Sequence, residues 1–379
     1  TSLTRPPAAI WADLKFGQFI CDTGTIPDRE PFSVYSDPQL SCVRTDWLGQ
    51  AIFYKVFRIG ERMGGNDPVS RLETGLEMLR MLQVVLNLLL LLLLFVAYRR
   101  SGSLPLACLG LLLLLPAAPP ILGRLRTEQF GLICFAGVLA ALRRPTLSRS
   151  SLVVVPLLFV FWSNTHASFP IGLLLLAVFL VGRVIEICCE QNICNPLRTL
   201  GDAQSRRLLM VLLLAVGATM LNPYGPAVYG KLVDLYRAPN VGDMLGWGAL
   251  DFNSWKLIPI LMLAIYFALA LTQAMSPKAF SPTQILLILT IGVLPLWKGR
   301  LIVWWFVLVP TLLLPHLAAI GEQLKCRCLS YQSVPSLRKT MAAIVMAALL
   351  LPLVGPGNWV LSKKPRTLNN ALPPETPWR

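Results

Sequence analysis

The chain consists of long apolar runs separated by short polar connections, and this pattern continues from about residue 81 to residue 355. Several runs reach the ~20 residues that an α-helix needs to cross a bilayer, while others are shorter. Backbone polar groups inside lipid must be satisfied within the segment, so such runs predict helices. We therefore expect an all-α, polytopic integral membrane helical bundle of about ten helices. The runs are 81–98, 104–122, 127–142, 151–163, 169–188, 207–222, 257–274, 284–297, 301–320 and 340–355.

The polar flanks of this region predict three parts. We expect residues 1–75 to form an extracytoplasmic loop domain with interfacial helices, residues 76–355 the transmembrane helical domain, and residues 356–379 a polar C-terminal tail. In the first part, apolar residues recur at near-helical spacing around Trp11 and Trp47, which is typical of helices lying on a membrane surface. This part has no signal-peptide pattern, so we expect a further transmembrane helix to precede it.

The composition agrees with a protein whose main solvent is lipid. Hydrophobic residues make up 55% of the chain and charged residues 14%, with a mean hydropathy of +0.62, whereas a soluble domain carries about 25% charged residues. The formal net charge of +15 comes from Lys and Arg between the apolar runs, not from one basic stripe, so nucleic acid is not an expected partner. Cys21 and Cys42 fall in the first part, where a disulfide is chemically permitted, but their spacing leaves the pairing open.

The basic residues also predict an orientation. The connections around 99–100, 143–149, 183–207 and 325–339 are rich in Arg and Lys, whereas the alternate connections hold fewer. By the positive-inside bias, the rich side is cytoplasmic. We thus expect a multi-pass protein of the plasma (inner) membrane with its other face open to the outside or periplasm.

The sparse polar side chains are clustered at the ends of apolar runs, and simple alternation of the helices brings the clusters to that outer face. The clusters contain Asp46, Arg126, Glu128, Asn164, His166, Asn222 to Gly225, Asp251, Lys298 and Arg300. A membrane protein can build one site from distant segments in this way. Transporters instead tend to place ionisable residues near the bilayer midplane and to contain internal repeats, and this sequence shows neither pattern.

An ordered series of short motifs resembles the bacterial polytopic glycosyltransferases of the C-type fold, in the branch related to protein mannosyltransferases and lipopolysaccharide-core glycosyltransferases. The resemblance covers about residues 9 to 320 and rests on the set, not on any one motif. It implies a membrane enzyme that moves a sugar from a polyprenyl-phosphate donor to an extracytoplasmic acceptor. The motifs are Trp11–Gln18, Gly24–Pro27, Glu30–Ser33, Thr45–Leu48, Arg126–Phe130, Asn164–His166, Leu221–Gly225, Leu250–Phe252 and Gly299–Arg300.

Transfer from such a donor needs a base for the acceptor proton and cations for the donor phosphate. Asp46 and Asp13 are the candidate catalytic bases, and Asp46 stands where relatives carry a glutamate. Arginine suits a phosphate because its guanidinium is a planar fork that stays charged. The candidate phosphate ligands are Arg300, Lys298 and Arg126.

The remaining candidate substrate-binding residues have two interpretations. Each contacts the sugar or phosphate, or it has a structural role as an ion pair, a hydrogen bond to a loop carbonyl or a turn. Isolated carboxylates are compatible with Mg²⁺, with Mn²⁺ or with no metal. This set comprises Glu128, Asn164, His166, Asn222 and Tyr224.

Three functions remain open from the sequence. A glycosyltransferase is favoured because the apolar runs hold few charges and the polar clusters share one face. The alternatives are a transporter or flippase-like protein without covalent chemistry, and a catalytically inactive member of the family.

Overall fold

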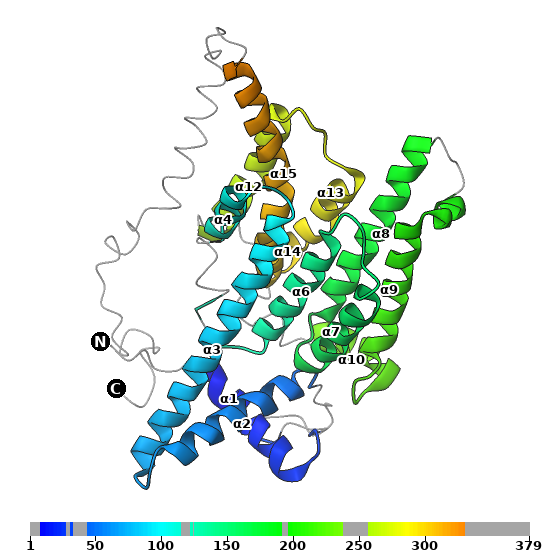
Figure 1. Ribbon diagram of the computed structural model, residues 1–379. Helices are drawn as coiled ribbons and strands as arrows, with labels where there is room; N and C mark the ends of the chain where they lie inside the picture. The colour runs from blue at the N-terminus through cyan, green and yellow to red at the C-terminus, as the bar shows by residue number, and fades with distance from the viewer. Residues whose placement is uncertain are drawn as a thin grey trace. The chain divides into compact units, whose positions relative to one another are not determined.

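The structure is a computed structural model that describes residues 8–27, 31–32, 44–114, 122–123, 125–191, 196–237 and 257–329. Every regular element within these ranges is a helix, as Figure 1 shows. The prediction of an all-α protein is therefore confirmed for this part of the chain. The predicted run at 340–355, the tail at 356–379, Asp251 and Cys42 lie outside the described residues.

Three helices in the described ranges are long and apolar enough to cross a membrane. They are α3 (Pro68–Arg99), α8 (Phe169–Gln191) and α15 (Ile302–Leu329). The other apolar runs form shorter helices. These are α4 (Leu104–Leu112), α6 (Glu128–Leu142), α7 (Ser151–Thr165), α9 (Ala203–Thr219) and α12 (Leu257–Met275).

The N-terminal part forms two helices, of which the second packs on both the first and α3 (Figure 1). They are α1 (Ala8–Thr23) and α2 (Trp47–Met63). α3 begins well before the apolar run, because the Asp67 carboxylate accepts the backbone N–H of Ser70 at 2.8 Å and Pro68 occupies the first turn. This helix runs without a break through residue 75, the boundary expected between the first two parts.

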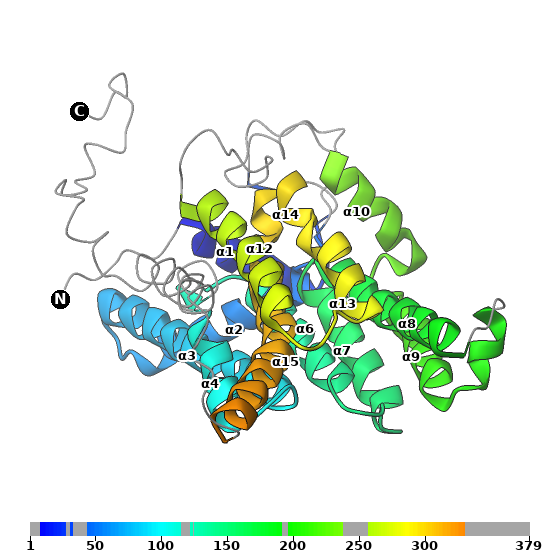
Figure 2. The same cartoon turned by 90° about the horizontal axis from the view of Figure 1, so that it is seen from above.

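An aromatic cluster joins α6, α7 and α15, which lie close together in Figure 2. Trp162 of α7 stacks on Trp304 of α15 with ring centroids 5.9 Å apart, and Phe135 of α6 meets Trp304 edge-on at 5.4 Å. All three side chains are fully buried. Gly172 of α8 completes the cluster, because a Cβ there would lie 2.3 Å from the Trp162 ring. This cluster sets the spacing of the helices that carry the pocket described below.

The run predicted at 284–297 is not one regular helix. It divides into α13 (Pro282–Leu287), a π-helical turn at Ile288–Gly292 and α14 (Leu294–Trp297). The hydroxyl of Tyr266 in α12 donates to the Gly292 carbonyl at 2.6 Å, which satisfies one backbone group at this irregularity. The remaining elements are η2 (Pro196–Gly201), η3 (Gly225–Ala227), α10 (Val228–Arg237) and η5 (Gly299–Leu301).

Candidate functional site

A pocket of about 360 Å³ forms where α1 and α2 meet the start of α6, the end of α7 and η5. Six of the sequence-predicted site residues line it, although they come from segments far apart in the chain. Three of its lining residues are carboxylates and three are arginines, so the pocket combines both charges. The lining residues are Asp13, Arg44, Thr45, Asp46, Arg126, Thr127, Glu128, His166, Ala167 and Arg300.

Most of these residues stand at helix ends, because the helix interiors are apolar. Asp46 is the residue before α2, and Glu128 is the first residue of α6, where the helix dipole favours a negative charge. His166 follows the last residue of α7, and Arg300 lies in η5. The short connections thus bring polar groups to one end of an apolar bundle.

One buried glutamine joins the two candidate bases. Gln50 is 1% exposed, and its Nε2 donates to Asp13 Oδ1 and to Asp46 Oδ2, both at 3.1 Å. α1 and α2 approach closely enough for this bridge because residue 17 is glycine: a Cβ on Gly17 would lie 2.2 Å from the Gln50 carbonyl oxygen. The two carboxylates therefore act on one another and share one positioning residue.

This environment changes the acidity of Asp13. Burial and, to a smaller extent, the nearby negative charge of Asp46 raise the pKa of Asp13 from its ordinary value of 3.8 to about 6. The hydrogen bond from Gln50 and the charges of Arg44 and Arg126 act in the opposite direction. A carboxylate with this pKa is largely ionised at neutral pH and is still basic enough to accept a proton, which are the requirements for a general base.

His166 is held in one tautomer by a chain of hydrogen bonds. The indole Nε1 of Trp162 donates to Ser168 Oγ at 3.0 Å, and Ser168 Oγ lies 2.7 Å from His166 Nδ1. The Ser168 backbone N–H also donates to Nδ1, at 3.2 Å. Nδ1 is thus the acceptor, so the ring proton is on Nε2. Burial lowers the pKa of His166, so it is a neutral donor at physiological pH.

The arginines of the pocket are held by different neighbours. Arg300 Nη2 lies 3.3 Å from Glu128 Oε2, in an ion pair that connects η5 with α6. The Arg44 guanidinium carbon lies 3.5 Å from the centroid of the Phe16 ring, a cation–π contact. Glu128 therefore forms an ion pair with Arg300, which lies in a distant segment of the chain.

Three predicted substrate-binding residues support the pocket from behind and do not line it. Asn164 Oδ1 accepts from Trp47 Nε1 at 2.9 Å, which fixes the start of α2 against α7. The Asn222 Nδ2 donates to a backbone carbonyl of α7 at 2.6 Å. The Tyr224 hydroxyl accepts the backbone N–H of Arg44 at 2.9 Å. These contacts favour the structural interpretation of the three residues.

Lys298 does not line the pocket; its Nζ lies 5.6 Å from the centroid of the Trp297 ring. Sequence reasoning missed Gln50 and Arg44. Gln50 is detectable as a polar residue four positions after Asp46, on the same helix face. Arg44 is two residues before Asp46, but its role depends on Phe16, a contact that sequence alone does not indicate.

Within the described residues, no group of three or more His, Cys, Asp or Glu side chains is arranged to hold a metal ion. The chain matches no protein-family model, no curated protein and no solved structure. The interpretation of the pocket therefore rests on its own geometry and chemistry.

Proposed function

We propose that this pocket transfers a sugar from a polyprenyl-phosphate donor to an acceptor on the extracytoplasmic side of the plasma (inner) membrane, as in the polytopic C-type-fold glycosyltransferases that the sequence resembles. The observation that carries the proposal is one pocket that combines the Gln50-bridged pair Asp13 and Asp46 with three arginines. A base and a set of phosphate-binding cations are the two requirements of this reaction.

In the proposed step, Asp13 takes the proton of the acceptor hydroxyl. The acceptor oxygen then forms a bond to the anomeric carbon of the sugar, and the bond from that carbon to the phosphate oxygen breaks. The polyprenyl phosphate leaves with the electron pair and the negative charge. Asp13 suits the role of base because burial raises its pKa to about 6, while Asp46 supports that raised pKa.

The cations stabilise the donor and the leaving group. Arg300 is oriented by Glu128, and Arg44 is positioned over Phe16, so both guanidinium groups lose little freedom when a phosphate binds. His166 contributes an Nε2–H donor for a sugar hydroxyl or a phosphate oxygen. Such fixed donors stabilise charge that develops in the transition state.

The surroundings suit a lipid-linked donor. α3 exposes large apolar side chains such as Leu88 and Leu92, which are 61% and 58% exposed and fit contact with acyl chains. A multi-pass bundle of about ten spans in the plasma membrane, with the pocket on the outer side, would let the polyprenyl chain stay in lipid while its phosphate enters the pocket. A transporter is less well supported, because most charges of the pocket stand at helix ends.

The test is sugar transfer in right-side-out proteoliposomes supplied with a labelled polyprenyl-phosphate sugar. Asp13→Asn keeps the shape and an acceptor for Gln50 but removes the base, so turnover should fall by roughly 10²- to 10⁴-fold while donor binding persists. Asp22→Asn is the matched control, since Asp22 is an exposed carboxylate of the same helix. Full transfer by Asp13→Asn contradicts the proposal, and so does donor movement across the bilayer without a new glycosidic bond.

A further inference from the structure

A second pocket, of about 250 Å³, lies at the other end of α6. Arg143 follows the last residue of α6, whereas Glu128 of the first pocket is its first residue. The helix rise of 1.5 Å per residue separates the two pockets by roughly 20 Å. The lining residues are Arg143, Phe179, Ser281, Thr283, Gln284, Leu287, Thr311, Leu312 and Pro315.

Among the described residues, Arg143 is the only charged one that lines this pocket. Its Nε and Nη2 both donate to the hydroxyl oxygen of Ser101, at 3.1 and 2.9 Å. Within the part of the chain that the structure describes, no carboxylate forms an ion pair with it. The end of α6 supplies only partial negative charge. A half-buried guanidinium without an anion is costly, so the pocket is electrostatically suited to take one.

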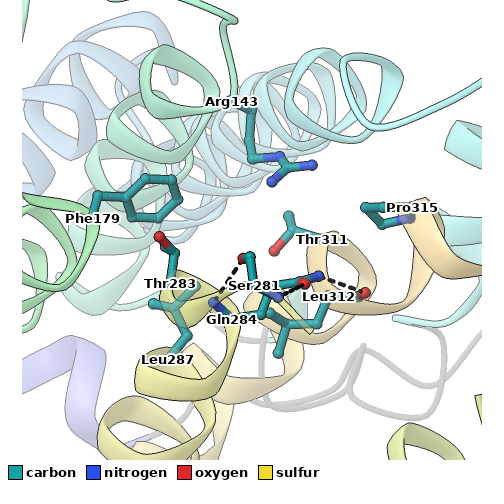
Figure 3. Close-up of a pocket in the computed structure, with 9 residues that line it drawn as sticks. All are labelled: Arg143, Phe179, Ser281, Thr283, Gln284, Leu287, Thr311, Leu312 and Pro315. Carbon is teal, nitrogen blue, oxygen red and sulfur yellow. Dashed lines mark hydrogen bonds between the residues drawn. The ribbon is translucent and has the colours of Figure 1, made fainter. Parts of the chain in front are cut away.

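The groups that face Arg143 are neutral and can donate hydrogen bonds. Figure 3 shows the guanidinium across the pocket from the side chains of Ser281, Thr283 and Gln284. Ser281 Oγ accepts from the Gln284 backbone N–H at 3.3 Å, so its own hydrogen remains available. Thr283 makes no side-chain hydrogen bond to any described residue. Thr311, in contrast, already donates to the Leu308 carbonyl at 2.6 Å.

We propose that this pocket binds the phosphate group of a phosphate mono- or diester, with Arg143 as the charged ligand and Ser281 and Thr283 as hydroxyl donors. A guanidinium and neutral hydroxyls recognise phosphate oxygens without a competing carboxylate. The apolar wall of Phe179, Leu287 and Pro315 is compatible with a lipid headgroup, and the same chemistry fits free phosphate. This site has no base and so differs from the proposed transfer site.

The experiment measures binding of two probes to the purified full-length protein in detergent. One probe is inorganic phosphate, followed by the rise in melting temperature with chloride as the reference anion. The other is phosphatidic acid, followed by native mass spectrometry, with diacylglycerol as the reference lipid that lacks the phosphate. Binding of both probes indicates a site for free phosphate, and binding of phosphatidic acid alone indicates a lipid headgroup site.

In either case, Arg143→Gln should weaken probe binding by about tenfold or more, because a charge-assisted contact is lost. The matched control is Arg144→Gln, since Arg144 is the exposed neighbour and pairs with Ser148 Oγ at 3.0 Å. Thr283→Val keeps the packing against Gly182 and should weaken binding several-fold, and it tests the site if Arg143→Gln fails to fold. Absence of binding, or equal loss in the Arg143 and Arg144 variants, overturns the proposal.

Discussion

The two ends of α6 carry pockets of about 360 and 250 Å³ that differ in chemistry. The pocket at Glu128 combines three carboxylates with three arginines, whereas the pocket at Arg143 contains one cation among neutral donors. In the first, the carboxylates Asp13 and Asp46 share Gln50, and burial together with the charge of Asp46 raises the pKa of Asp13 to about 6. In the second, none of the described lining residues is suited to take a proton at neutral pH. The first arrangement suits a reaction, and the second suits binding alone.

The difference has a physical origin in how each charge is compensated. At the Glu128 end, each arginine has a nearby carboxylate or aromatic ring, so the pocket is stable when empty and holds its groups in position. At the Arg143 end, compensation comes from a serine hydroxyl and a helix terminus, which leave part of the charge for a ligand. Opposite charges held in fixed positions are suited to catalyse a reaction. A cation whose charge is only partly compensated is suited to bind an anion.

After the loss of the base in Asp13→Asn, the largest functional effect at the Glu128 end is expected from Arg300→Ala. The donor phosphate loses a charge-assisted contact, so donor affinity should fall by about 10- to 100-fold, as measured by the Kd in the proteoliposome system. Lys298→Ala is the control, because Lys298 is two residues away and does not line the pocket. A larger loss in the Lys298 variant would show that the phosphate binds elsewhere.

Gly17→Ala should disrupt the pairing of the carboxylates without removing any charge. The added Cβ would lie 2.2 Å from the Gln50 carbonyl oxygen, so α1 must move away from α2, at a cost of roughly 1–3 kcal/mol. We expect a lower melting temperature together with reduced transfer. Gly217→Ala in α9 is the matched control, since its Cβ would meet nothing within 4 Å. If Gly17→Ala behaves like the control, the close approach of α1 and α2 is not needed.

The smallest effect concerns stability and pH. The folded pKa of Asp13 is about 6, above the ordinary value of 3.8. Because the folded state binds this proton more tightly, the ionised group costs stability as the pH rises from about 4 to 6, and the full cost applies above 6. Asp13→Asn should therefore be more stable than the native chain above pH 6, by roughly 1–2 kcal/mol, and equal to it near pH 4.

Melting temperatures across this pH range check that expectation, with Asp22→Asn as the control. A gain that is the same at pH 4 and pH 8 would mean that Asp13 is not the group responsible. The measurement also tests the comparison between the two ends of α6, because the Arg143 pocket has no carboxylate to produce such a pH dependence.

Much of the helical architecture was predictable from local pattern. The apolar runs around α3, α8 and α15 indicated helices directly, because a long apolar segment has few other ways to satisfy its backbone. The run at 284–297 was less predictable, since its π-helical turn is associated with a contact from Tyr266 in another helix. The apolar run predicted the helix only from residue 81. The earlier start of α3 at Pro68 has a local signal in Asp67 and Pro68.

The site was predictable as a set of residues and not as an arrangement. Alternation of helices indicated that Asp46, Arg126, His166 and Arg300 share one face, and the structure brings them to one pocket. The alternation of helices could not indicate that Asn222 lies behind the pocket and donates a hydrogen bond to a carbonyl of α7. Which polar residue faces the pocket and which supports it depends on side-chain direction, which has no signature in the spacing of apolar runs.

The sequence by itself determined the helical class, the apolar character and the inventory of charged groups at helix ends, because each depends on short-range pattern. Only the tertiary structure decided that Gln50 bridges Asp13 and Asp46, since Asp13 and Gln50 are 37 positions apart and meet only where Gly17 lets two helices touch. It also decided that Glu128 pairs with Arg300, 172 positions away. The chemistry of each end of α6 therefore depends on packing between distant segments, and the amino-acid order determines that packing only through the complete fold.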